Sequence, residues 1–216
     1  MRRTVVLSAI ALGGLLVLGV AILIFSNLAE ARRAEAAVPP MGAIVTIDGA
    51  RIHYVDLGEG PPVVMLHGLA GNVRNYTQTV ATELARTHRV ILIDRPGSGY
   101  SERPNSTTAS IQSQADVIHR VIEELSLQRP VIVGHSLGGS VALAYAARYP
   151  EDLAHLVLLA PAATQVEPRP PIDKFKVDSA FVREALAYTV AIPASKRSGT
   201  ETLRVIFSPQ TPPEEL

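Results

Sequence analysis

The chain has 216 residues, of which 47% are hydrophobic, enough for one domain with a buried core and a short additional segment. Its 20 lysines and arginines balance its 20 aspartates and glutamates, so the charge gives no reason to expect a nucleic-acid partner. Cysteine is absent, which excludes disulfides, thiolate metal sites and a cysteine nucleophile but leaves the cellular compartment open.

The N-terminal segment is apolar. Residues 4–25 carry no charge and follow Met1-Arg2-Arg3. A helix of this length, at about 1.5 Å per residue, crosses a hydrocarbon core of about 30 Å. We predict a single-pass transmembrane anchor at 4–25, with residues 1–3 cytoplasmic, residues 26–40 a linker, and the globular part on the extracytoplasmic side. The alternative is a secretory signal peptide, cleaved near Ala34-Glu35-Ala36, that would release the protein.

Short apolar runs alternate with helical patterns over residues 41–163, which we predict to be the folded core. Two runs flanking Asp48-Gly49 predict a β-hairpin. The predicted strands are 44–47, 51–57, 63–66, 90–93, 131–133 and 155–159, and the predicted helices are 73–87, 108–127 and 140–148. Such alternation predicts an α/β fold with a mostly parallel sheet and helices on both faces.

A candidate nucleophile follows the strand at 131–133. The segment Gly134-His135-Ser136-Leu137-Gly138 fits G-x-S-x-G, in which a serine lies on a sharp turn between a strand and a helix. The glycines flanking Ser136 avoid side-chain collisions within the tight turn. Such short patterns also occur in ordinary turns, but here strand, turn and helix are in the required order. We therefore predict that Ser136 is a nucleophile for acyl transfer.

Three motifs resemble those of the α/β-hydrolase superfamily, in the superfamily's order. They are H-G-L at 67–69, D-R-P-G-S-G-Y-S at 94–101 and G-H-S-L-G-G at 134–139. The resemblance covers about residues 45–163 and implies an α/β-hydrolase fold and a serine hydrolase of carboxylic esters or related acyl bonds. A serine nucleophile argues against the epoxide hydrolases and haloalkane dehalogenases of this superfamily, which use an aspartate there.

The resemblance also implies a role for individual residues. Ser136 matches the nucleophile, and the backbone N–H groups of Leu69 and Leu137 match the two donors of an oxyanion hole. His67 and Gly68 match the loop that supports this hole. No metal-ligand spacing, phosphate loop or dinucleotide fingerprint is present, so we expect no cofactor and no metal.

The superfamily's acid and catalytic histidine follow later strands, in the order Ser, acid, His. After Ser136 the chain has only His155, at the start of a strand and away from the nucleophile. Asp94 matches a structural turn residue, and we expect His88 and His119 on helix surfaces and His53 on the hairpin. We therefore expect no triad acid or histidine in these 216 residues.

We interpret the chain as the N-terminal part of a longer hydrolase, inactive as given, in which residues 164–216 begin a cap. The expected partners are a small acyl substrate and, through the anchor, a membrane. Ester, thioester, lactone, amide and C–C bonds remain open as substrates, and so does the oligomeric state. The alternative is a non-catalytic anchored binding or scaffold protein with a degenerate hydrolase fold.

Overall fold

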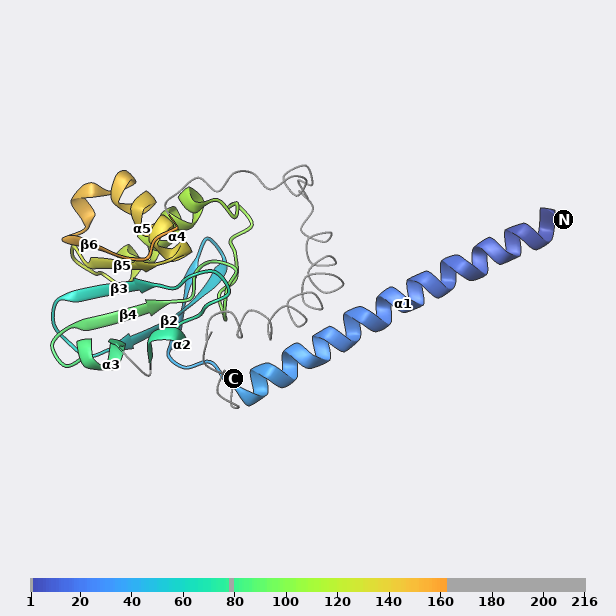
Figure 1. The fold of residues 1–216 in the computed structure, drawn as a ribbon, viewed down its shortest axis with the longest axis horizontal. Coiled ribbons are helices and arrows are strands. Elements are labelled where there is room, and N and C mark those ends of the chain that lie inside the picture. Colours follow the sequence, from blue (N-terminus) through green and yellow to red (C-terminus); the bar gives the residue numbers. More distant parts are fainter. Residues whose placement is uncertain (1, 78–79, 163–216) are drawn as a thin grey trace, which may run out of the picture. The chain divides into compact units, whose positions relative to one another are not determined.

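The computed structural model describes residues 2–77 and 80–162, which form two units. One contains the N-terminal helix, and the other is a globular unit that begins at Pro40 (Figure 1). The predicted cap region at 164–216 lies outside the described residues.

Helix α1 spans Arg2–Ala37. It continues through most of the predicted linker at 26–40, because this stretch is rich in alanine, a strong helix former, and the first prolines are Pro39 and Pro40. By length and composition Ile10–Ala37 can cross a membrane, with a mean hydropathy of 2.3 over an 18-residue window, a test that a signal sequence also passes.

The globular unit is built on a six-stranded sheet in the order β1-β2-β4-β3-β5-β6. Its strands are β1 (Ala43–Ile47), β2 (Ala50–Leu57), β3 (Pro62–Leu66), β4 (Arg89–Ile93), β5 (Val131–His135) and β6 (His155–Leu159). Strands β3 to β6 are parallel, whereas β1 and β2 pair antiparallel with each other and β2 with β4. Asp48 and Gly49 turn the hairpin with φ of 49° and 76°, as a type I′ turn requires. The predicted mostly parallel sheet is confirmed.

The described helices of this unit are α2 (Arg74–Thr77), α3 (Val80–Leu84), α4 (Ile111–Glu124) and α5 (Leu137–Arg148), followed by a 3₁₀ turn at Pro150–Asp152. The helix predicted for 73–87 corresponds to α2 and α3, which lie within those bounds on either side of residues 78–79, outside the described residues, and the helical stretch ends at Leu84. Helix α4 begins after Ser110, whose side chain caps it by accepting the N–H of Ser113.

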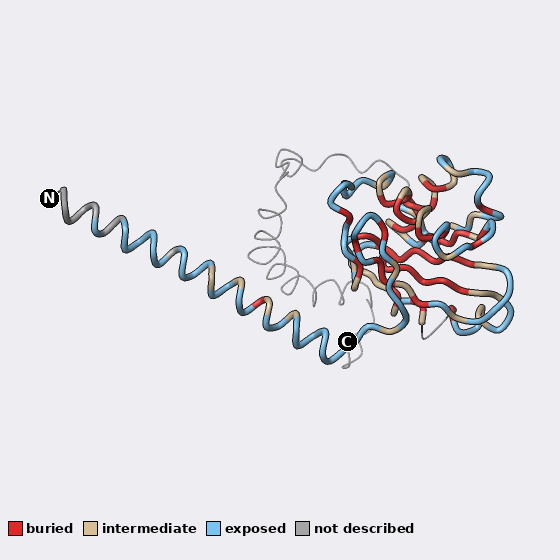
Figure 2. The backbone as a smooth tube through the Cα atoms, turned by 180° about the vertical axis from the view of Figure 1, so that it is seen from behind, coloured by how far each residue is buried: buried red, intermediate tan, exposed pale blue. Residues whose placement is uncertain are grey.

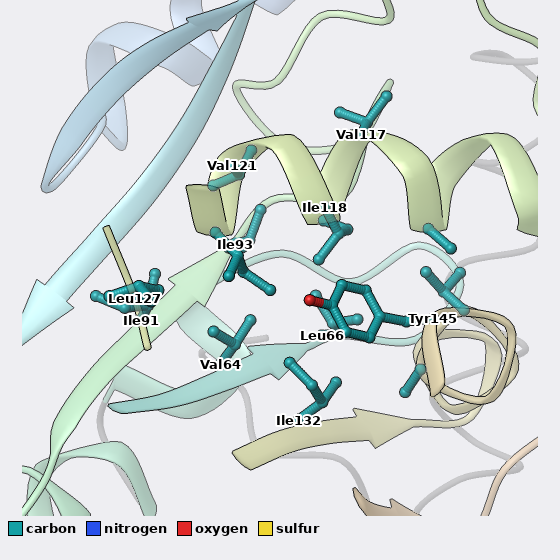
Figure 3. Packing of buried hydrophobic residues seen from close by; sticks show 14 of the residues in the cluster. Val64, Leu66, Ile91, Ile93, Val117, Ile118, Val121, Leu127, Ile132 and Tyr145 are labelled. Carbon is teal, nitrogen blue, oxygen red and sulfur yellow. The ribbon is translucent and has the colours of Figure 1, made fainter. Parts of the chain in front are cut away.

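Helices cover both faces of the sheet, which confirms the prediction (Figure 1). Successive residues of a strand point to opposite faces, so Val64 and Leu66 of β3 pack toward α4 and α5, while Val63 and Met65 pack toward α2 and α3. Figure 3 shows Tyr145 of α5 among the side chains that pack on the face covered by α4 and α5, and β3, β4 and β5 in the centre of the sheet are mostly buried (Figure 2). This rigid centre holds the loops that follow β3, β4 and β5.

Candidate active site

The sharpest backbone turn in the predicted motif is at Ser136, between the end of β5 and the start of α5. Its φ of 51° and ψ of −118° are rare for a residue with a side chain. The Ser136 N–H donates to Leu159 O at 3.0 Å, and Ser136 O accepts from Gly139 N at 2.9 Å and Ala162 N at 3.0 Å. The backbone after β6 therefore holds the turn in its strained conformation.

The flanking glycines are required by close backbone packing. A Cβ atom on Gly134 would lie 2.5 Å from Gly138 O, and one on Gly138 would lie 2.5 Å from His67 O. A Cβ on Gly139 would lie 2.7 Å from Pro161 Cβ. Because real Cβ atoms essentially never approach closer than 3.0 Å, glycine at these positions allows α5 to pack against the end of β3.

The loop that follows β3 lies against this turn. A Cβ atom on Gly68 would be 3.1 Å from Ser136 Cβ and 3.2 Å from His135 Nδ1. The next residue, Leu69, is 79% exposed, and no described residue accepts a hydrogen bond from its N–H or from that of Leu137. The Leu137 N–H is also at the N-terminus of α5, where the helix dipole favours negative charge. Within the described part of the chain, two backbone donors without an acceptor are therefore located in the segments that meet at Ser136.

Both ring nitrogens of His67 are engaged in the same loop. Its Nδ1 is 2.9 Å from Gly68 O, and its Nε2 is 3.0 Å from the Arg95 backbone N–H, which must donate. His67 is thus neutral, with the proton on Nδ1. Burial and the Arg95 charge lower the pKa of His67, although its hydrogen bond to Gly68 acts in the opposite direction. No ring nitrogen of His67 remains to take a proton from Ser136.

A buried ion pair that the sequence did not predict lies behind this loop. His53 Nδ1 is 2.8 Å from Asp94 Oδ2, and the two side chains are 1% and 0% exposed. The Asp94 carboxylate also accepts the backbone N–H groups of Val73 at 2.8 Å and Tyr100 at 2.9 Å, while His53 Nε2 contacts Met41 O. Asp94, directly after β4, thereby connects strand β2 with the loops that contain Val73 and Tyr100.

The pKa values of the pair move apart. Burial disfavours both charged forms, but hydrogen bonds reverse its effect. Hydrogen bonds from His53 to Asp94 and Met41 raise the pKa of His53. Hydrogen bonds that the Asp94 carboxylate accepts from His53, Tyr100 and Val73 lower the pKa of Asp94. Both nitrogens of His53 face acceptors, so the protonated ring satisfies them.

Arg95 is a second buried group that sequence reasoning missed, with a residue exposure of 3%. Its guanidinium donates from Nε to His67 O at 2.8 Å, from Nη2 to Gly68 O at 2.9 Å and from Nη1 to Gln114 Oε1 at 2.6 Å. Burial lowers its pKa, but a guanidinium stays charged at neutral pH. The sequence feature that could have indicated a structural role for Arg95 is its position directly after Asp94, in the motif that follows β4.

No histidine is hydrogen-bonded to Ser136 Oγ, and all six histidines of the chain are among the described residues. His135 is exposed, and His155 begins β6, at the opposite end of the parallel strands from Ser136. His119 lies on α4, as predicted, and stacks on Tyr149 with ring centroids 3.8 Å apart. His88 was expected on a helix, but it lies in the turn before β4 because α3 ends at Leu84. In the described part of the chain, no group of three or more His, Cys, Asp or Glu side chains could hold a metal ion.

The chain is similar to several hydrolases. It is 33% identical over 129 residues to a 2-hydroxy-6-oxo-2,4-heptadienoate hydrolase of Pseudomonas putida, covering 59% of this chain and 47% of that protein. It is 36% identical over 126 residues to a 2-hydroxymuconate semialdehyde hydrolase of a Pseudomonas species, covering 57% and 44%. The chain thus spans about half the length of the curated relatives it matches.

Solved structures agree with this similarity. An esterase from Exiguobacterium antarcticum matches with a TM-score of 0.57 and 29% identity, over 77% of this chain and 60% of that one. An N-acyl homoserine lactone degrading enzyme matches with a TM-score of 0.54 and 28% identity, over 76% and 63%. The model of the α/β hydrolase fold family matches residues 61–202, and the chain therefore belongs to the α/β-hydrolase family.

Proposed function

We propose that this chain carries the nucleophile and the oxyanion hole of a membrane-anchored serine hydrolase that cleaves carboxylic esters or related acyl bonds. The observation that carries the proposal is the strained conformation of Ser136, at the junction of β5 and α5 and against the Gly68 loop. Strain of about 1–3 kcal/mol at a non-glycine residue persists where the surroundings impose it, which is typical of active sites.

In the proposed reaction, Ser136 Oγ attacks the carbonyl carbon of the substrate. The Oγ–C bond forms and the hydroxyl proton passes to a base; the bond from the carbonyl carbon to the leaving group then breaks, and the leaving group takes the bonding electron pair and receives that proton from the base. The negative charge that develops on the carbonyl oxygen is stabilised by the N–H groups of Leu69 and Leu137. Removing one such donor typically costs about 3 kcal/mol of transition-state stabilisation.

Among the described residues, no side chain is hydrogen-bonded to Ser136 Oγ as a base would be. Since none of the six histidines contacts Ser136 Oγ, we propose that the imidazole comes from outside the 216 residues, and that the chain alone forms the acyl-enzyme only slowly. Removing triad members lowers kcat by about 10⁴–10⁶-fold in well-studied serine hydrolases.

The class of bond is proposed from the relatives. Their names include esterases, a lactone-degrading enzyme and hydrolases of 2-hydroxy-6-oxo-dienoate compounds, all of which act on substrates with a carbonyl carbon. We propose an acyl compound as the substrate class for this chain. We propose the membrane anchor from the apolar composition of α1. We propose that the globular unit lies on the extracytoplasmic side because Arg2 and Arg3 precede the apolar segment.

Chemical rescue tests the proposal with the chain as it is. The full chain in detergent is incubated with a fluorophosphonate probe, with and without added imidazole, and the modified residue is identified by peptide mass spectrometry. We expect imidazole to accelerate labelling at Ser136. The variant Ser136→Ala should not be labelled, whereas Ser98→Ala, which changes another serine between glycines, should react like the original chain.

Two outcomes would contradict the proposal. Labelling of Ser136→Ala at another serine would show that the nucleophile was assigned wrongly. A folded chain that never reacts at Ser136, even with imidazole, would favour the anchored binding or scaffold protein.

A further inference from the structure

The peptide unit between Gly68 and Leu69 contains one of the two proposed oxyanion donors. In a trans peptide the C=O and N–H groups point in opposite directions. The direction of the Leu69 N–H is therefore set by whatever holds Gly68 O.

Gly68 O is held by three donors. Arg95 Nη2 and His67 Nδ1 each lie 2.9 Å from it, and the Gly71 N–H lies 3.3 Å from it. Arg95 Nε also holds the preceding carbonyl, His67 O, at 2.8 Å. The planar guanidinium thus binds two successive carbonyls of the loop with two parallel N–H groups, which fixes the orientation of both peptide planes.

We propose that Arg95 is a positioning residue of the oxyanion hole: by binding Gly68 O it aims the Leu69 N–H at the carbonyl oxygen of an acyl group on Ser136. This inference rests on the proposed function, because it assigns the support of the same hole. Arg95 contacts no reacting atom and acts through the Gly68–Leu69 peptide.

The charge of Arg95 adds to its geometric role. Among the described residues no carboxylate forms an ion pair with it, and its positive charge is stabilised by hydrogen bonds to the carbonyls of His67 and Gly68 and to the Gln114 amide oxygen. A cation on Gly68 O polarises the peptide and makes the Leu69 N–H a stronger donor. Burying a charge without a counter-ion is costly, and its field favours negative charge nearby.

Gln114 completes the support. Its Oε1 accepts from Arg95 Nη1 at 2.6 Å, and its Nε2 donates to Ala109 O at 3.0 Å. The side chain is buried on α4, so the helix that covers one face of the sheet determines the position of the guanidinium. The loop after β3, the turn after β4 and α4 are thereby joined through one side chain.

The test measures the acyl carbonyl directly. The full chain in detergent is acetylated at Ser136 with p-nitrophenyl [1-¹³C]acetate in the presence of imidazole, and the imidazole is removed by gel filtration. Infrared difference spectra against unlabelled acetate then report the stretching frequency of the acyl C=O. Hydrogen bonds from the hole lower this frequency, so the frequency reports the strength and aim of the donors.

We expect Arg95→Lys and Arg95→Met to raise the acyl C=O frequency and to slow acetylation, by about 10-fold for lysine and about 100-fold for methionine, where complete loss of an oxyanion donor costs about 10²–10³-fold. Lysine keeps the charge but cannot bind both carbonyls. The matched control is Arg89→Lys. Arg89 binds the Asp56 carboxylate through Nε and Nη2 at the other end of β4, so this variant should leave rate and frequency unchanged.

The outcomes separate this inference from the proposed function. No acetylation of Ser136 in the original chain would contradict the proposed function itself. Acetylation at Ser136 with the same C=O frequency in both Arg95 variants, in preparations whose circular dichroism shows a folded unit, would overturn the role of Arg95. If Arg95→Met does not fold, Arg95→Lys still decides the question, because it preserves charge and volume.

Discussion

Replacing Ser136 with glycine is expected to stabilise the globular unit while removing the nucleophile. The backbone at this position has φ 51° and ψ −118°, a conformation that glycine adopts readily and that a residue with a Cβ adopts under strain. The Ser136 hydroxyl makes no hydrogen bond with a described residue, so its removal loses no such contact.

The magnitude follows from two opposing contributions. Relief of backbone strain is worth about 1–3 kcal/mol. Glycine gains conformational entropy in the unfolded chain, which offsets about 0.5–1 kcal/mol. Subtracting the midpoints of these ranges leaves a net gain of about 1 kcal/mol in the free energy of unfolding for Ser136→Gly, within limits of about 0–2.5 kcal/mol. For a unit of roughly 120 residues this corresponds to an increase in Tm of about 2–8 °C.

The matched comparison is Ser136→Ala, which removes the hydroxyl but keeps the Cβ and therefore the strain. We expect its stability to lie within about 0.5 kcal/mol of the original chain. Thermal unfolding is followed by near-UV circular dichroism of tyrosine, since the chain has no tryptophan and five of its six tyrosines lie in the globular unit. If Ser136→Gly is no more stable than Ser136→Ala, the backbone at Ser136 does not carry the strain that we infer from its dihedral angles.

Three further results are expected. Because the pKa of His53 is raised in the folded protein, its contribution to stability is complete below about pH 6.5 and is lost as pH rises through the folded pKa. Because the pKa of Asp94 is lowered, its contribution is complete above about pH 3.9 and is lost as pH falls through the folded pKa. Urea unfolding should therefore show a maximum contribution of this pair between these values, absent in His53→Phe. Gly138→Ala should destabilise the unit by about 1–3 kcal/mol in urea, because the new methyl group overlaps Leu66 O. The chain should remain in the membrane pellet after a carbonate wash, and external protease should digest its globular unit.

Each of these results has a contrary outcome. An unchanged pH profile in His53→Phe would mean that the ion pair does not contribute to stability. A Gly138→Ala variant as stable as the original would show that α5 can move away from β3. Soluble protein beginning near Ala37 would identify the N-terminal segment as a cleaved signal peptide.

The sequence by itself determined the architecture of the globular unit. The apolar runs that form β3 to β6 are short, separated by helical patterns and bounded by glycine, proline and aspartate. Each strand could therefore be predicted from neighbouring residues alone. The position of Ser136 was predictable for the same reason, since strand, turn and helix are contiguous around it. Helix ends were less predictable, as α4 shows, since it spans Ile111–Glu124 where the pattern predicts a helix over 108–127.

The support of the candidate site was decided only by the tertiary structure. His53 and Asp94 are 41 residues apart, and Arg95 lies 27 residues from Gly68, so no local pattern joins them. Whether a buried charge is tolerated depends on which carbonyls the fold brings within hydrogen-bond distance, and such contacts form only when β2, β4 and α4 are packed together. Local patterns specify where a chain turns, but the environment that shifts the pKa of a histidine or aims a peptide N–H is created by residues that the sequence keeps apart.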